Sequence, residues 1–215
     1  MKIIYNTSMD KTNDILYCLC NKYHNHNDSR INIAKMYLIS HVTSSEIERL
    51  KKERDNKNTI KLYEKIGKLI KEKFNTKGLG NIKSINENTI KRILKKHRDL
   101  LNIISDNGYS ELNSARSFCS KYLHFHYEDL YFIFDRNAVK KINELSKKYY
   151  KEIKEQRKEL KLTNLKKNDY DEKYKEFFLK SYSIMEKMNE VEKRKFNIRQ
   201  FDNSILGRHE WKNNK

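Results

Sequence analysis

The feature that most constrains this chain is that none of its 215 residues is proline and only five are glycine. Proline interrupts a helix because it lacks a backbone donor, and glycine weakens a helix through its conformational entropy. Apolar residues also recur every three or four positions along most of the chain, which places them on one face of a helix. We therefore predict an all-α fold.

The composition leaves enough apolar material for a packed core. Hydrophobic residues make up 37% and charged residues 35% of the chain, which raises the question of disorder. However, the 14 Tyr, 9 Phe and single Trp exceed what disordered chains carry. We predict one helical domain over residues 1–215, which could divide into an N-terminal lobe (1–80) and a hairpin-containing lobe (81–200), followed by a tail (201–215).

The apolar spacing also locates the helices. Gly78 and Gly80 mark a loop at 76–80, and Gly108 is a candidate cap for the helix before it. A capping-box pattern predicts a short charged helix from Ser45 to about residue 54. The other predicted helices cover 9–24, 31–42 (where a strand stays possible), 59–74, 88–105, 112–126 and, with a turn at 163–171, the charged stretch from 137 to about 199.

The charge of the chain points to an anionic partner. Lys and Arg number 47 against 29 Asp and Glu, a formal net charge of +18. A charge of this size favours binding to a nucleic-acid backbone. The densest basic run lies on one predicted helix and comprises Lys91, Arg92, Lys95, Lys96 and Arg98.

We expect a cytoplasmic protein with no membrane partner. No apolar run approaches the ~20 residues that a spanning helix needs, and the N-terminus lacks the apolar region of a signal peptide. Two groups of residues hold metal-ligand types, namely Cys18, Cys20, His24 and His26, and Cys119, His124 and His126. Neither has the paired spacing typical of zinc ligands, so we predict no metal and no other cofactor.

The segment that carries the clearest chemistry runs from Ser114 to Ala138, SARSFCSKYLHFHYEDLYFIFDRNA. Asp135 follows a run of aromatic and apolar residues and precedes a predicted helix. A carboxylate at a helix N-terminus is stabilised by the free amides and the helix dipole. Asp135 can therefore be a helix cap, a catalytic carboxylate kept ionised by the same amides, or both.

The order of helix, turn, helix, aromatic loop and Asp135 resembles the helix-hairpin-helix DNA glycosylase superfamily, in particular its 8-oxoguanine and AlkA-like branches. The phrase SFCSKYLHFH…FIFDRNA also resembles small glycosylase-like proteins linked to phage defence. The resemblance covers about residues 88–145 and implies a helix-hairpin-helix bundle, extended here by long charged C-terminal helices, with Asp135 as the catalytic residue. The expected hairpin, residues 108–114, has a single glycine where the family hairpin is glycine-rich.

The resemblance implies a DNA glycosylase that flips a modified base, such as a hypermodified phage base, and hydrolyses its N-glycosidic bond. Arg116 falls where bifunctional members carry a lysine; a guanidinium stays protonated, so the enzyme should be monofunctional. The candidate base pocket comprises His124, His126, Tyr127, Tyr131 and Phe132. The candidate DNA-binding residues are Arg116, Lys121, Lys91, Arg92, Lys95, Lys96, Arg98 and Arg136. A monomer is favoured.

Two other functions stay open. Arg92 and His97 fit the R-x₄₋₆-H motif of HEPN-type ribonucleases, a small all-α class that acts as dimers. The chain could also be a nucleic-acid-binding protein without catalytic activity.

Overall fold

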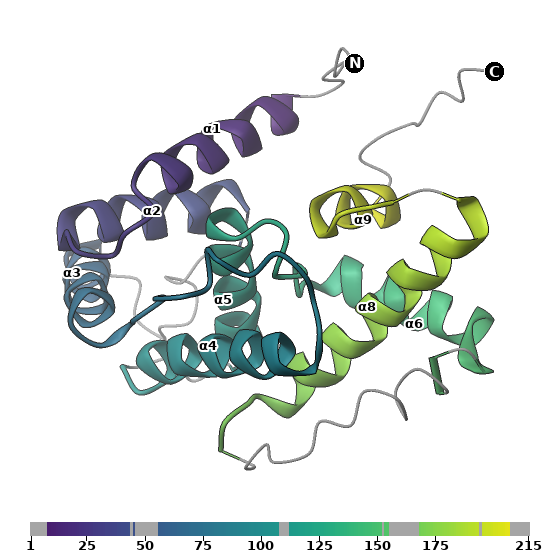
Figure 1. Cartoon of the computed structure of the whole chain (residues 1–215). Helices are drawn as coiled ribbons and strands as arrows, with labels where there is room; N and C mark the ends of the chain where they lie inside the picture. The colour runs from purple at the N-terminus through teal and green to yellow at the C-terminus, as the bar shows by residue number, and fades with distance from the viewer. Residues whose placement is uncertain are drawn as a thin grey trace.

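The computed structural model describes residues 8–43, 45, 56–107, 112–151, 153–154, 168–193 and 195–206. These residues form helices and no strand, which confirms the all-α prediction (Figure 1). The helices are α1 (Ser8–Lys22), α2 (Ser29–Val42), α3 (Asn56–Lys73), α4 (Glu87–Ser105), α5 (Leu112–His126), α6 (Arg136–Lys148), α8 (Glu172–Glu192) and α9 (Ile198–Ile205). None of these helices is long and apolar enough to cross a membrane.

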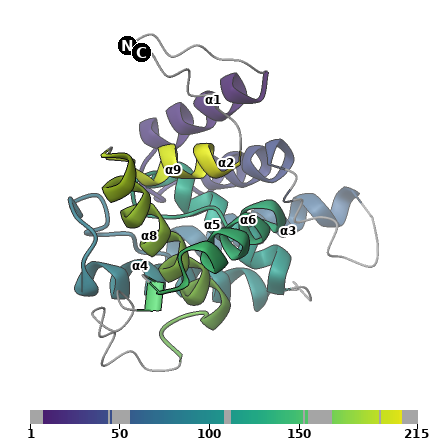
Figure 2. The same cartoon turned by 90° about the vertical axis from the view of Figure 1, so that its right-hand side faces the viewer.

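Helix α5 lies at the centre of the molecule. It packs against α1, α2 and α4, while α6 packs against α8 and α9 at the opposite end (Figures 1 and 2). From Ala115 to His126 every residue of α5 except Ser117 is buried. A helix buried on all sides must satisfy its polar side chains within the protein, and those of α5 do so through contacts described below.

Side chains at the helix N-termini explain where several helices begin. A residue at this position has extended backbone, and its side chain accepts a hydrogen bond from an otherwise unpaired amide of the first turn. Each such cap stabilises its helix by about 1 kcal/mol. The capping residues are Asp28 of α2, Asn86 of α4, Asp135 of α6, Asp171 of α8 and Asn197 of α9.

Two sequence predictions about the C-terminal region need correction. The helix predicted to continue to about residue 199 instead ends at Glu192, because Lys193 adopts a left-handed conformation with φ of 51°. A new helix, α9, then begins at Ile198, and its Phe201 is fully buried against Phe132. The first residues of the predicted tail thus belong to the core. The short helix predicted after Ser45, the cap at Gly108 and residues 163–167 of the predicted turn lie outside the described residues.

Candidate nucleic-acid interface

Asp135 caps α6, as its position in the sequence predicts. Its backbone is extended, and its Oδ1 accepts a hydrogen bond of 2.8 Å from the amide of Ala138. The side chain is half-buried. Its catalytic role stays a prediction.

The structure does not bring the five candidate base-pocket residues into one cavity. Four of them are at most 3% exposed and belong to the core: His124, His126, Tyr131 and Phe132. The ring of His124 joins the Tyr17 hydroxyl, 2.5 Å from Nε2, to the carbonyl oxygen of Tyr131, 2.6 Å from Nδ1. These contacts connect α1, α5 and the segment after α5. Tyr127, by contrast, lines the surface pocket described below.

Arg116 and Lys121 point into the protein rather than toward a nucleic acid. The guanidinium of Arg116 makes two parallel contacts with Asp171, Nε–Oδ1 at 2.5 Å and Nη2–Oδ2 at 2.8 Å, and both residues are buried. Burial raises the pKa of Asp171, but hydrogen bonds from Arg116 and from the amide of Tyr174 outweigh it and lower the pKa. Lys121 donates to the carbonyl oxygen of Thr43 at 2.9 Å. Both side chains hold helices together.

The basic run on α4 is mostly neutralised. Three ion pairs with Nζ–O distances of 2.7–3.4 Å join Lys91 to Glu87, Lys95 to Asp169 and Lys96 to Asp99. Arg92 donates to the carbonyl oxygen of Gly78 at 2.7 Å. Arg98 is half-buried, and Arg136 is exposed in the first turn of α6.

The Arg92–His97 pair does not form an exposed site. The ring of His97 is fully buried and lies parallel to that of Tyr174, with ring centroids 3.7 Å apart. Burial lowers its pKa to about 3, so the imidazole is neutral. Arg92, five residues earlier, bonds to the loop at Gly78 rather than to His97.

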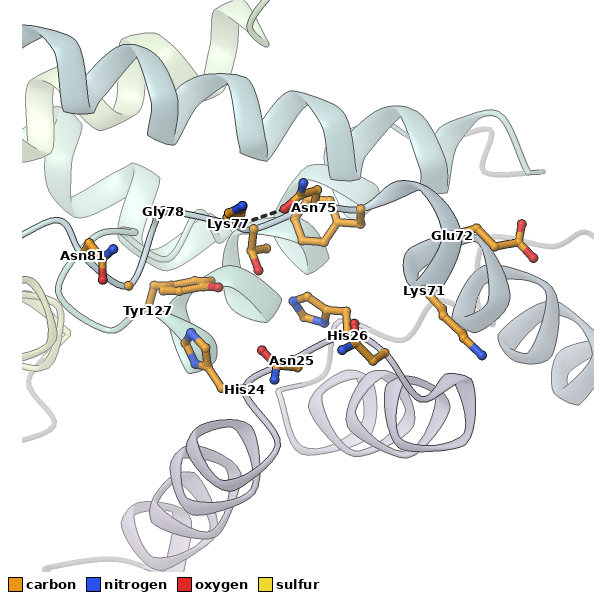
Figure 3. Close-up of a pocket in the computed structure, with 14 residues that line it drawn as sticks. His24, Asn25, His26, Lys71, Glu72, Asn75, Lys77, Gly78, Asn81 and Tyr127 are labelled. Carbon is orange, nitrogen blue, oxygen red and sulfur yellow. Dashed lines mark hydrogen bonds between the residues drawn. The ribbon is translucent and has the colours of Figure 1, made fainter.

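A pocket of about 580 Å³ opens where three segments meet (Figure 3). Its walls come from residues 24–27 between α1 and α2, from residues 71–81 at the end of α3 and in the following loop, and from Tyr127 after α5. The rings of His24 and Tyr127 meet edge to face with centroids 4.8 Å apart. We name this cavity the histidine pocket.

The histidines of this pocket are neutral. Burial and the positive charge of Lys35 lower the pKa of His24, and the same causes lower that of His26 to about 3. Lys35 itself is fully buried, and its Nζ donates to the carbonyl oxygen of Tyr23 and contacts His126 Nε2 at 3.0 Å. Its amine therefore lies beneath the turn that forms one wall, and no carboxylate of the described residues pairs with it.

Gly78 fixes the loop that forms the opposite wall. Its φ of +84° is rarely adopted by residues with side chains, and an added Cβ would lie 2.4 Å from Arg92 Nη2. Arg92 holds the loop on α4 through the Gly78 carbonyl oxygen. The glycine-containing loop that the sequence predicts is therefore held in place by Arg92 and forms part of the pocket wall.

An excess of unpaired positive charge lies on α3 and the loop after it. Residues 60–83 contain seven lysines and two glutamates, a formal charge of +5. All seven lysines are exposed, and within the part of the chain that the structure describes none makes an ion pair. We name these residues the lysine surface: Lys61, Lys65, Lys68, Lys71, Lys73, Lys77 and Lys83.

The lysine surface was missed in the sequence because lysines are frequent throughout the chain. Three of its members, Lys61, Lys65 and Lys68, have the spacing that places them on one helix face. This pattern is visible in the sequence, but whether a lysine is neutralised depends on partners such as Asp169, 74 residues from Lys95. In the sequence, His24 and His26 stand out only as residue types that can bind metal. Among the described residues no group is arranged to hold a metal ion.

Comparison of the chain with protein-family models, with curated proteins and with solved structures found no match.

Proposed function

We propose that this protein binds nucleic acid through the lysine surface. The observation that carries the proposal is the contrast in ion pairing between two basic helices. The three lysines of α4 pair with carboxylates, whereas the seven lysines of the lysine surface make no ion pair within the described residues. A polyanion releases its condensed counterions only when it meets unpaired cations, so the α3 face is the stronger electrostatic site.

The geometry of the lysine surface suits a phosphate backbone. Lys61, Lys65 and Lys68 follow one face of α3, and their Cα atoms span about 10 Å at a rise of ~1.5 Å per residue. A nucleic-acid strand advances ~3.4 Å per phosphate along its helix axis, so this row covers about three phosphates. Lys71 and Lys77 continue the row to the histidine pocket.

The proposal is tested by replacing three lysines of α3 together, Lys61→Gln, Lys65→Gln and Lys68→Gln. Binding to a fluorescent 20-mer, single- or double-stranded, is followed by anisotropy between 50 and 200 mM salt. Each phosphate contact contributes about −0.9 to the slope of log K against log salt on duplex DNA, and about −0.7 on single strands. The slope should therefore become shallower by two to three in the triple variant.

The matched control carries the same three changes on α4, Lys91→Gln, Lys95→Gln and Lys96→Gln. Because these lysines are already paired, the salt slope should stay near that of the unaltered protein. If the α4 variant loses the slope and the α3 variant keeps it, the interface lies on α4 and the proposal is wrong. If the unaltered protein binds neither oligonucleotide, nucleic-acid binding itself is excluded.

A second candidate is excision of a modified base from the bound DNA by a monofunctional N-glycosylase, with Asp135 as its carboxylate. It is favoured by the half-buried carboxylate at the N-terminus of α6, where one oxygen accepts the Ala138 amide. That placement agrees with the role that the helix-hairpin-helix resemblance gives Asp135. A carboxylate in that position stabilises the oxocarbenium-like sugar left as the base departs.

Base excision is tested by incubating the protein with normal, damaged and phage-derived DNA. Released bases are identified by mass spectrometry, and abasic sites by alkali-induced strand breaks. Asp135→Asn should abolish release with DNA binding unchanged, and it should cost little stability because asparagine caps helices nearly as well. If none of these DNAs releases a base while the protein binds them, the chain is a binding protein.

A further inference from the structure

Neither the proposed binding of a DNA backbone nor the proposed role of Asp135 uses the rings and asparagines of the histidine pocket. Its volume of about 580 Å³ lies within the range of ~300–1,000 Å³ typical of small-molecule sites. It is polar, and only one acidic side chain, Glu72, is among the residues that line it. Figure 3 shows Glu72 and Lys71 at the edge of the pocket, with His24, His26 and Tyr127 around its middle.

Four of the fourteen residues that line the pocket carry rings, namely His24, His26, Phe74 and Tyr127. His24 meets Tyr127 edge to face, and His26 packs against Phe74 with ring centroids 5.4 Å apart. Lowered pKa values keep both imidazoles uncharged at neutral pH. Neutral rings of this kind are surfaces on which a flat heteroaromatic ligand stacks, and stacking contributes about 1–3 kcal/mol per base.

Side-chain amides line the same space. Asn25, Asn27 and Asn81 are exposed, and their side chains make no hydrogen bond within the described residues. An amide offers a carbonyl acceptor and two N–H donors, which matches the mixed donors and acceptors on the edge of a nucleobase. Asn75 differs, since its Oδ1 accepts the backbone amide of Lys77 at 2.7 Å and shapes the loop.

The electrostatic surroundings favour an attached anion. Lys77 stands on the loop above the rings, and Lys71 lies at the pocket edge (Figure 3). Beneath the turn that carries His24 and His26, the buried amine of Lys35 bonds to the carbonyl oxygen of Tyr23. Three amines against one carboxylate leave the site positive, as a phosphate group requires.

We propose that the histidine pocket binds a single nucleotide, with the base against the His24–Tyr127 wall and the phosphate toward Lys77. A free mononucleotide and an unstacked nucleotide of a bound strand offer the same groups. Binding of a nucleotide within a strand rests on the proposed nucleic-acid binding, whereas binding of a free mononucleotide does not. The pocket is continuous with the lysine surface through Lys71 and Lys77.

The first experiment titrates the full-length protein with the nucleoside 5′-monophosphates by isothermal calorimetry, with ribose 5-phosphate as the control ligand. At least one nucleotide should bind, and ribose 5-phosphate should bind at least tenfold more weakly because it lacks the base. Asn81→Leu and Lys77→Gln, both at exposed loop positions, should each weaken binding by about tenfold, as loss of a hydrogen bond to a charged or buried group does. Asn137→Leu, an exposed asparagine on α6, is the matched control and should leave affinity unchanged.

The second experiment addresses a nucleotide within a strand. A single-stranded oligonucleotide with 2-aminopurine at one position or at its 5′ end reports unstacking by a rise in fluorescence. The rise should occur on binding and be lost in Asn81→Leu, while the affinity governed by α3 is retained. Strand binding without any fluorescence change, together with no mononucleotide binding, would overturn the pocket proposal and leave the lysine surface intact. Mononucleotide binding without strand binding would support the pocket and exclude the proposed function.

Discussion

At the residue scale, burial explains why histidines that the sequence suggests for functional sites are part of the core. Five histidines are buried or half-buried beside rings, and four of them have lowered pKa values because burial disfavours the imidazolium. The fifth, His124, bonds to Tyr17 and the Tyr131 carbonyl oxygen. His124 and His126 bond backbone carbonyl oxygens, whereas His24, His26 and His97 pack against neighbouring rings.

Lys35 is the residue whose charge state should show most clearly in stability. Burial lowers its pKa from 10.5 to about 8, and the nearby Cys20 thiol opposes the shift. Between pH 10.5 and 8 the unfolded chain gains a proton that the folded protein does not, so folding loses stability as pH falls through this window. Relative to Lys35→Met, the unaltered protein should gain up to about 1.4 kcal/mol per pH unit as pH rises from 8.

The measurement is urea unfolding of both proteins at pH 8, 9 and 10. Only the difference between them is interpreted, because buried tyrosines such as Tyr122 have raised pKa values and also titrate toward alkaline pH. A difference that stays constant across this range would show that Lys35 ionises normally in the folded protein.

At the element scale, one buried ion pair ties the start of α8 to α5. Arg116 lies on α5, and Asp171 both receives its guanidinium and accepts the Tyr174 amide at the start of α8. The guanidinium also lies over the Phe134 ring, 5.5 Å from its centre. The amphipathic pattern predicts both helices, but it contains no information that these two residues, 55 apart in the chain, meet.

Loss of one partner of this pair should destabilise the protein strongly. Arg116→Met leaves the Asp171 carboxylate buried without its cation, for which a cost of about 3–5 kcal/mol is expected. Arg116→Met combined with Asp171→Asn should recover part of that cost, because the asparagine is neutral and still caps α8. Urea unfolding of the single and double variants measures both values.

The control for this prediction is the exposed pair Lys141–Glu144 on α6, with an Nζ–Oε2 distance of 3.7 Å. Lys141→Met should change stability by less than about 0.5 kcal/mol, because exposed pairs contribute little. A similar small effect for Arg116→Met would mean that solvent reaches Asp171 in the folded protein.

At the scale of the whole molecule, folding places unpaired positive charge beside a pocket. The net charge of +18 is spread along the entire sequence, yet folding pairs the three lysines of α4 and three of the four lysines of α8 with carboxylates. It leaves α3 and the next loop unpaired, beside a pocket assembled from three separate segments. Nucleic-acid binding and nucleotide binding are therefore proposed for one side of the molecule.

The sequence alone determined the helical class, the positions of most helices and the cap at Asp135, because these follow from local periodicity, the absence of proline and one side chain's reach to a nearby amide. Only the tertiary structure decided that Arg116 is buried, that four of the five predicted pocket residues belong to the core and that the lysines of α4 are paired while, among the described residues, those of the lysine surface are not. Burial and ion pairing depend on residues from distant segments, and no spacing rule specifies which segments pack together.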